Sequence, residues 1–327
     1  MNDRDLLARL IAGPASGSEL ARAAGLTRAA VWKQVQALRA AGLAIEASPG
    51  QGYVLRQPPQ LLDADAILAR LPSARRPLLA ALDVAWTLDS TNSELLRRDP
   101  PAAGTAVLPA ERQSGGRGRR GRAWASPLAA NIYLSLSRRY AGGLARLPGV
   151  SLVAGVATAE ALHASGYTGV RLKWPNDLVV AEGAGLRKLG GLLVEGGGEA
   201  GGPARAVVGL GLNVAMPTAV ASAIDQPWID LATLAGGKAP SRNEVVATLL
   251  AHLLPALAQF DASGLEPFLA RYAAMDALAG RAVVVQEGAR RRLGEALGLA
   301  GDGALRVQVD GREERVHAGE VSIRVAA

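Results

Sequence analysis

The sequence Gln113-Ser114-Gly115-Gly116-Arg117-Gly118-Arg119-Arg120-Gly121-Arg122, closed by Trp124, alternates glycine with arginine. Glycine lets the backbone approach a ligand closely, and the guanidinium group donates in pairs to carboxylate or phosphate oxygens. An anionic ligand is therefore the first hypothesis for this loop. The alternative is a basic loop that is only solvated, and the flanking sequence has to decide between the two.

Part of the same loop, Gly116-x-Gly118-x-x-Gly121, also satisfies the dinucleotide-binding fingerprint. That fingerprint requires a strand before the glycines and a helix that opens at the third one. Here Pro127 follows, and residues 131–136 alternate in polarity as a strand does. We therefore reject a Rossmann fold for this chain.

The composition limits the class of protein. The chain has 327 residues, of which 49% are hydrophobic and 20% charged, which is enough for two or three globular domains. The absence of cysteine excludes disulfides, thiolate metal sites and a cysteine nucleophile. His163, His252 and His317 lack metal-ligand spacing, so the identity of any metal ligand stays unknown.

Charge and hydropathy bear on the partners and the location of the chain. The net charge of +7 fits an acidic partner or nucleic acid. The apolar runs are interrupted before the ~18 residues of a spanning helix, and residues 1–5 lack the pattern of a signal peptide. We therefore expect a cytoplasmic protein with no membrane partner.

Residues 1–60 are predicted to form a winged helix-turn-helix domain that binds DNA. Ser16 and Glu19 make a capping box for a second helix, Gly25 makes a turn, and Thr27 caps a third helix. Two short strands, 43–47 and 53–55, would form the wing. The third helix should bury Val31, Val35 and Leu38 and expose the candidate DNA-binding residues Arg28, Trp32, Lys33 and Gln36. A helical domain used only for packing or protein contacts is the alternative.

The rest of the chain is predicted to form two further domains. After a linker at 57–60, residues 66–275 should form a central α+β domain, whose segments we list in chain order: strands at 82–88, 105–110 and 131–137, a buried helix at 148–164, strands at 170–180, 188–195 and 206–214, and helices at 243–260 and 266–274. We expect Thr91 to cap the helix that follows the first of these strands. Residues 276–327 carry short predicted strands, at 282–286, 291–300, 304–309 and 314–325, with the spacing of a small β-barrel.

Polar motifs interrupt this pattern in a fixed order. They are Asp89-Ser90-Thr91-Asn92, the Gly-Arg loop, Lys173-Trp174-Pro175-Asn176-Asp177, Lys188-Leu189-x-Gly191-x-Leu193-Val194-Glu195, Gly209-x-Gly211-x-Asn213 and Gly319-Glu320-x-Ser322-x-Arg324. In this order, and together with the winged helix, they resemble the bifunctional biotin–protein ligases that are also biotin operon repressors. The resemblance implies a central mixed sheet of the class II synthetase type and a C-terminal SH3-like barrel.

The resemblance also implies the chemistry. Biotin and MgATP would form biotinyl-5′-AMP, which a lysine of the biotin carboxyl carrier protein of acetyl-CoA carboxylase then attacks. Arg119 and Lys188 would be catalytic. The biotin site would comprise Ser90, Thr91, Asn92, Gln113, Arg117, Gly118, Arg119, Lys188 and Gly191. The ATP and adenylate site would comprise Arg119, Arg120, Trp124, Lys173, Asn176, Lys188, Asn213 and Arg324.

This chemistry agrees with the residues themselves. Joining a carboxylate to a phosphate needs fixed positive charge and no protein nucleophile, and a mobile loop would keep water from the intermediate. Asp177 could contact Mg²⁺, with an ion pair or a turn as the alternative. Operator DNA and a homodimer in the adenylate-bound state are further partners that the resemblance implies.

Three other functions stay open from the sequence. A lipoate or octanoate ligase would share the fold and the central lysine, although Ser90, Thr91, Asn92 and Gln113 suit a compact ureido group better than a long apolar chain. A transcriptional regulator that only senses biotin would not need Lys188 and Arg119. A ligase whose winged helix no longer recognises an operator is the third alternative.

Overall fold

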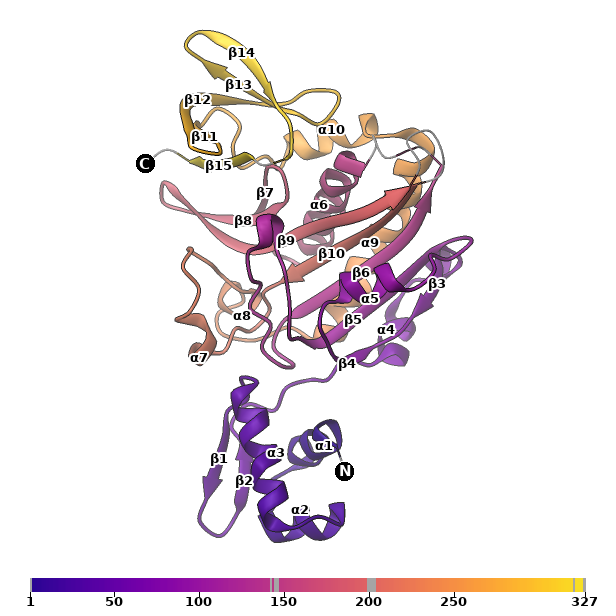
Figure 1. Ribbon diagram of the computed structural model, residues 1–327, viewed down its shortest axis with the longest axis vertical. Helices are drawn as coiled ribbons and strands as arrows, with labels where there is room; N and C mark the ends of the chain where they lie inside the picture. The colour runs from indigo at the N-terminus through magenta and orange to yellow at the C-terminus, as the bar shows by residue number, and fades with distance from the viewer. Residues whose placement is uncertain (1, 142, 144–146, 199–203, 320, 326–327) are drawn as a thin grey trace.

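The computed structural model describes the whole chain except residues 1, 142, 144–146, 199–203, 320 and 326–327. Glu320, which belongs to the last of the predicted motifs, therefore lies outside the described residues. Figure 1 shows the N-terminal part at one end of an elongated molecule, a large sheet in the middle and a smaller sheet at the other end. This is the predicted arrangement of winged helix, central mixed sheet and C-terminal β-domain.

The N-terminal part has the predicted helix-turn-helix and wing. Its elements are α1 (Asp3–Ala12), α2 (Gly17–Ala24), α3 (Arg28–Ala40), β1 (Ile45–Ser48) and β2 (Gly52–Leu55). Ser16 and Glu19 form the predicted capping box, Gly25 is left-handed, and the Thr27 side chain caps α3. These caps satisfy N–H groups that a helix start otherwise leaves unpaired, so each helix begins where the sequence predicts.

A mixed sheet of eight strands forms the centre of the molecule. Its order is β3-β5-β6-β10-β9-β8-β7, with β4 beside β5. β3 and β4 run parallel to β5, and the other pairs are antiparallel. The strands are β3 (Leu79–Leu82), β4 (Ala85–Leu88), β5 (Thr105–Gln113), β6 (Ile132–Tyr140), β7 (Val170–Lys173), β8 (Asp177–Glu182), β9 (Gly185–Gly198) and β10 (Ala204–Leu212).

The single strand predicted at 82–88 is wrong. The chain instead forms β3 and β4, which break at Asp83 and Val84 because they pair with different parts of β5: Leu82 lies opposite Val107, and Ala85 lies opposite Ala110. The last predicted strand, 314–325, is likewise two strands, β14 (Arg312–Val316) and β15 (Val321–Val325).

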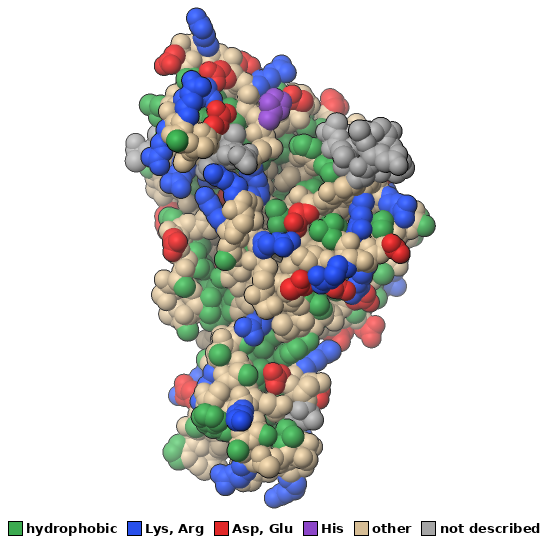
Figure 2. Space-filling model, in the orientation of Figure 1, with side chains coloured by type: hydrophobic (Ala, Val, Ile, Leu, Met, Phe, Trp, Pro, Cys, Tyr) green, Lys and Arg blue, Asp and Glu red, His purple; other side chains and the backbone are tan. Residues whose placement is uncertain are grey.

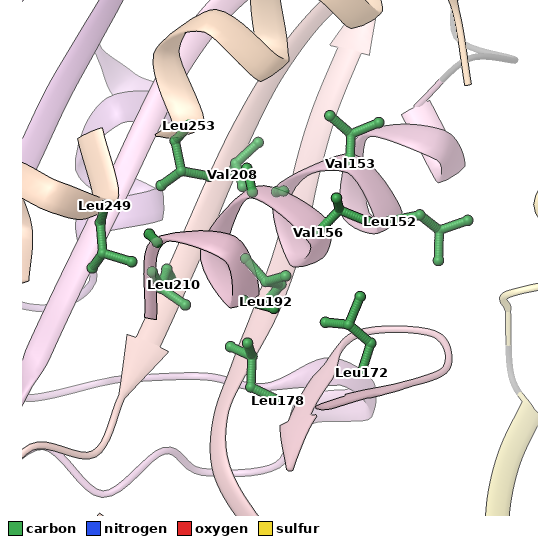
Figure 3. Packing of buried hydrophobic residues seen from close by; sticks show 14 of the residues in the cluster. Leu152, Val153, Val156, Leu172, Leu178, Leu192, Val208, Leu210, Leu249 and Leu253 are labelled. Atoms are coloured by element: carbon green, nitrogen blue, oxygen red, sulfur yellow. The ribbon is translucent and has the colours of Figure 1, made fainter. Parts of the chain in front are cut away.

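One face of the central sheet carries the main hydrophobic core. The helices α6 (Leu147–Ala164) and α9 (Arg242–Ser263) pack there against inward residues such as Leu192, Val208 and Leu210 (Figure 3). Both helices are long and apolar enough to span a membrane, but 67% and 56% of their apolar windows are buried inside the protein. Helices in the core of a globular protein are buried in this way. Smaller helices complete the domain: α4 (Ala64–Arg70), α5 (Thr91–Arg97), α7 (Thr218–Ala221), α8 (Leu231–Leu234), α10 (Glu266–Ala273) and 3₁₀ turns at Ser73–Leu78 and Arg119–Gly121.

The C-terminal part is an antiparallel sheet that packs on the central domain. Its strands are β11 (Ala282–Glu287), β12 (Arg290–Leu299), β13 (Leu305–Val309), β14 and β15, in the order β14-β13-β12-β11-β15. The buried Trp174 donates its indole N–H to the carbonyl of Gly303 at 3.1 Å. Trp174 therefore joins the two domains rather than lining a ligand site.

A short segment after the Gly-Arg loop is part of the winged-helix core. Leu128 and Ala129 are buried with α1 and α3 residues, and the Leu128 N–H donates to the carbonyl of Ala41 at 2.8 Å. The Tyr133 hydroxyl donates to the carbonyl of Pro127 at 2.8 Å, which ties the same segment to β6. The segment 127–129 thus connects the central sheet to the end of α3.

Replacing Leu128 with Ala is expected to destabilise the N-terminal domain by about 2–5 kcal/mol, because it leaves a cavity in a core that the two domains share. Urea unfolding and the rate of proteolysis between residues 56 and 63 measure the effect. Leu26→Ala, at an exposed leucine of the same domain, is the control. Equal small effects of both changes would contradict the shared core.

Candidate active site

The strand pattern decides which side chains reach the second face of the central sheet. Because side chains alternate along a strand, Val208 and Leu210 face the helical core while Val207, Gly209 and Gly211 face the other side. On that side lie α5 and the Gly-Arg loop. Ser135 of β6 and Leu193 of β9 lie directly beside Gly209 in the strand register.

The glycines of β10 make room for polar and aromatic side chains. A Cβ on Gly209 would lie 2.4 Å from Asn92 Oδ1, and one on Gly211 would lie 2.5 Å from the Trp124 indole. Neither distance is tolerable, so a larger residue would displace Asn92 or Trp124. The two interior glycines therefore leave room for the start of a helix and for an indole ring to approach the strand closely.

Thr91, Gln113 and Ser135 form a neutral polar cluster at the start of α5. The Gln113 Oε1 accepts from the Thr91 N–H at 2.9 Å and from its hydroxyl at 3.1 Å. Ser135 Oγ lies 2.7 Å from Thr91 Oγ1 and donates to Asn92 Oδ1 at 2.6 Å. Ser135 is completely buried. The sequence analysis missed it, because a single serine in an apolar strand carries no local signal.

The prediction that Thr91 caps α5 is wrong, and Ser90 caps it instead. Ser90 has the extended backbone of an N-cap residue, and its side chain accepts from the Ser93 N–H. Thr91 is already helical, so its hydroxyl turns to Gln113. Because Ser90 caps the helix, the buried side chains of Thr91 and Asn92 are available to line the site.

The Gly-Arg loop folds back on itself over this cluster. Gly118 donates to the carbonyl of Arg122 at 2.7 Å, and Trp124 donates to the carbonyl of Gly116 at 2.9 Å. Arg120 and Gly121 have positive φ, 59° and 70°, which closes the turn. Arg119 donates to Asn176 Oδ1 at 3.3 Å and to the carbonyl of Gly319 at 2.7 Å. The loop therefore touches both the central and the C-terminal domains, while the Arg120 side chain is exposed.

Cations gather beside the loop where the central and C-terminal domains meet, a region rich in Lys and Arg in Figure 2. Lys188 Nζ lies 2.7 Å from Asp177 Oδ1 and 5.5 Å from the centre of the Trp124 ring. Burial lowers the pKa of Lys173, and the nearby charges of Lys188, Arg324 and Arg122 lower it further, against the opposing effect of Asp177. Burial also lowers the pKa of Arg119. This end of the site is suited to bind an anion.

The two predicted asparagines mainly hold the backbone. Asn176 Nδ2 donates to the carbonyl of Leu192 at 2.7 Å. The buried Asn213 donates to the carbonyl of Ile229 at 3.1 Å. A Cβ added to Gly191 would lie 3.3 Å from Lys188 Nζ, so this glycine lies against the Lys188 amine. The indole N–H of Trp124 is buried with no hydrogen-bond partner among the described residues, so a ligand atom would satisfy it.

Asp177 is committed to an ion pair, which is the alternative that the sequence left open beside a magnesium contact. Within the described part of the chain, no three His, Cys, Asp or Glu side chains gather as a metal site. The candidate DNA-binding residues lie far from this region on α3, where Arg28, Trp32 and Lys33 are exposed and Gln36 is half-buried.

Comparisons with known proteins agree with this site. Residues 84–213 match the Biotin/lipoate A/B protein ligase family, residues 3–54 an HTH domain and residues 279–324 the Biotin protein ligase C terminal domain. The Bifunctional ligase/repressor BirA of Salmonella typhimurium is 40% identical over 311 residues, covering 95% of this chain and 93% of that protein. The chain belongs to the family of bifunctional biotin protein ligases and repressors.

Two further biotin protein ligases are similar to parts of this chain. The Biotin--[acetyl-CoA-carboxylase] ligase of Paracoccus denitrificans is 32% identical and covers 71% of this chain and 96% of its own length. A biotin protein ligase from Aquifex aeolicus, solved in complex with biotin and ATP, superposes with a TM-score of 0.62 at 25% identity, covering 76% of this chain and 100% of that one. The predicted family and the predicted three-part fold are confirmed.

Replacing Lys173 with Met is expected to stabilise the ligand-free ligase at neutral pH. Because the pKa of Lys173 is lowered in the folded chain, the unfolded chain binds its proton more tightly, and the charged form opposes folding. The loss of folding stability caused by this charge is complete at pH values below the lowered pKa of Lys173. It vanishes as the pH rises through the ordinary lysine pKa of about 10.4.

The melting temperatures of the variant and the wild-type protein, compared near neutral pH and above pH ~10, measure this effect. The gain should be present at neutral pH and lost at high pH. Lys238→Met, at an exposed lysine, is the matched control and should change little. A lower melting temperature of Lys173→Met at neutral pH would contradict the prediction.

Proposed function

We propose that this chain joins biotin to a lysine of the biotin carboxyl carrier protein through biotinyl-5′-AMP, and that it represses biotin synthesis genes in response to biotin. The observation that carries the proposal is the two-part site. A neutral polar cluster, Thr91, Gln113 and Ser135, lies on the same sheet face as a cationic group that includes Lys173 and Lys188. Biotin has the matching form, with an uncharged ring system and a carboxylate at opposite ends.

In the first step a carboxylate oxygen of biotin attacks the α-phosphorus of ATP. A P–O bond forms to give the mixed anhydride, and pyrophosphate leaves. In the second step the carrier lysine amine attacks the acyl carbon, AMP leaves, and the amine loses a proton as the amide forms. Neither step uses a protein nucleophile, so the protein contributes orientation and positive charge.

Arg119, Lys173 and Lys188 are the residues we assign to that charge, with Arg119 and Lys188 as the catalytic pair. Held by Asn176 and the Gly319 carbonyl, Arg119 is oriented before any ligand arrives, which lowers the reorganisation needed in the reaction. Arg324 faces the same cluster from the C-terminal domain, because its charge acts on Lys173. The nucleotide would come with Mg²⁺ as its MgATP complex.

The remaining assignments follow the contacts. We assign Ser90, Thr91, Asn92 and Gln113 to the uncharged end of biotin, with Arg117 and Gly118 beside it and Gly191 next to Lys188. Trp124 offers the adenine an indole face and an N–H that has no partner among the described residues, and we assign Arg120, Asn176 and Asn213 to the same part of the nucleotide site. A lipoate or octanoate ligase fits less well, since an alkyl chain would bring no hydrogen-bonding atoms to the polar Thr91 cluster. The Aquifex aeolicus relative, solved with biotin and ATP, supports the same choice.

Replacing Lys188 with Ala is expected to reduce biotin transfer to a purified carrier domain by a factor of about 100 or more, because it removes a cation from the reacting oxygens. Transfer of labelled biotin with ATP and Mg²⁺ measures the effect, and Lys238→Ala is the control. Tight biotin binding by a wild-type protein that transfers none would instead support a biotin sensor without ligase activity.

For repression we assign operator contacts to the exposed face of α3. Arg28 and Lys33 offer charges to phosphates, while Trp32, which is 55% exposed, and Gln36 can reach base edges in the major groove. We propose a homodimer in the adenylate-bound state and a cytoplasmic location as parts of this function. The HTH match over residues 3–54 supports the DNA-binding part.

Lys33→Ala is expected to weaken binding to a duplex from the promoter of the biotin synthesis genes and to lower the salt dependence by about one phosphate contact. Gln36→Ala should weaken binding to that duplex more than binding to an unrelated duplex, with little change in the salt dependence of binding. Fluorescence anisotropy over a range of salt concentrations measures both. Unchanged binding by both variants would show that α3 does not make the operator contacts. A wild-type protein that does not bind the duplex would be a ligase without an operator.

A further inference from the structure

Glu195 belongs to a predicted motif, but the reaction described above gives it no role. It lies on β9 beside Val207 in the strand register, on the sheet face that carries the site. Its carboxylate is shared between two partners. Oε2 accepts from Asn92 Nδ2 at 2.8 Å, and Oε1 accepts from Arg117 Nη2 at 3.3 Å.

Asn92 is fixed on every side by this arrangement. Its Nδ2 donates to the carbonyl of Leu193 at 3.1 Å as well as to Glu195, and its Oδ1 accepts from the Ser135 hydroxyl. Gly209 closes the space beneath it. Glu195 therefore helps to hold the floor of the neutral cluster.

Arg117 is fixed by the same carboxylate. The arginine also donates to Ser93 Oγ at 3.0 Å, so it spans from the Gly-Arg loop to α5 and β9. Among the described residues, Glu195 is the carboxylate that pairs with Arg117. One side chain thus links the floor of the uncharged end to the loop that covers it.

Because Glu195 pairs with Arg117, the net charge differs between the two ends of the site. At one end Arg117 and Glu195 form a pair without net charge. At the other end, Asp177 is the described carboxylate that acts on Arg119, Lys173 and Lys188, and Arg324 adds a further positive charge. Among the described residues of the site, the cationic end therefore has the larger excess of positive charge, and this is the end where a carboxylate and phosphates have to meet.

We propose that Glu195 is a positioning and specificity residue, which neutralises Arg117 beside the uncharged ring of biotin and so directs anionic groups to the opposite end. This proposal rests on the proposed function of the same site. Without Glu195, the half-exposed Arg117 guanidinium would lose its carboxylate partner and would leave an unbalanced positive charge beside the neutral ureido group. The bare cation would also attract a carboxylate or phosphate to the wrong end of the site.

The test uses the full-length Glu195→Gln variant, which keeps the shape and the contact with Asn92 but removes the charge. At saturating ATP, the KM for biotin should rise about 10-fold, with the loss in KM rather than kcat. Inorganic phosphate, added at constant ionic strength, should raise the KM of this variant further, in competition with biotin. The wild-type protein should respond much less to phosphate.

Three more variants make the test decisive. Arg117→Gln combined with Glu195→Gln removes the bare cation, so its phosphate response should return to that of the wild-type protein. Glu195→Asp keeps the charge and should respond to phosphate as the wild-type protein does. Glu182→Gln, in an ion pair with Arg187 outside the site, is the matched control and should leave both constants unchanged. These readouts apply even if the single Gln variant folds poorly.

Two results would overturn the proposal. One is equal phosphate sensitivity of the wild-type protein and Glu195→Gln. The other is a loss in Glu195→Gln that lies wholly in kcat, with an unchanged KM for biotin. Wild-type transfer of biotin in the same assay checks the proposed function separately, because a wild-type protein without transfer would refute that function and not the role of Glu195 alone.

Discussion

Bringing a carboxylate and a phosphate into contact requires positive charge that is fixed in place before they arrive. Fixed charge has a cost, because burial removes water from the cations and because neighbouring cations repel one another, and both effects lower the pKa of Lys173. The fold limits this cost with the half-buried carboxylate of Asp177, which lies 2.7 Å from Lys188. The remaining excess of positive charge destabilises the ligand-free protein and becomes favourable when anions bind.

The rest of the architecture supplies this charge from different parts of the chain. β7, β8 and β9 bring Lys173, Asp177 and Lys188 together, the Gly-Arg loop contributes Arg119, and the C-terminal sheet contributes Arg324. The buried Trp174 fixes the C-terminal sheet against the central one. On the other side, the segment 127–129 runs from Trp124 directly into the core of the winged helix. The ligand loop and the end of α3 are thus separated by only a few well-packed residues.

Features set by local chemistry could be predicted from the sequence. The caps at Ser16 and Thr27, the buried face of α3 and the glycines of β10 all depend on neighbours within a few residues, or on a missing side chain that the sequence displays directly. The order of the polar motifs sufficed for the family. The family resemblance also supplied Lys188 and Arg119, which the structure places beside the same cationic cluster.

Features set by distant contacts could not be predicted. Thr91 and Ser90 are equally good caps by type, and only the position of Gln113, 22 residues away, decides that Thr91 turns to the site. Strand register places Ser135 in the site and Glu195 beside Asn92. Contacts between domains determine how Leu128 packs with α3. The break between β3 and β4 likewise depends on where each segment pairs with β5.

The most direct measurement is a crystal structure of the full-length protein with a non-hydrolysable analogue of biotinyl-5′-AMP. The account predicts the ring system against Thr91, Gln113 and Ser135, the phosphate among Arg119, Lys173 and Lys188, and the adenine on Trp124. The phosphate bound at Arg117, or the adenine bound away from Trp124, would contradict the division of the site into a neutral and a cationic end.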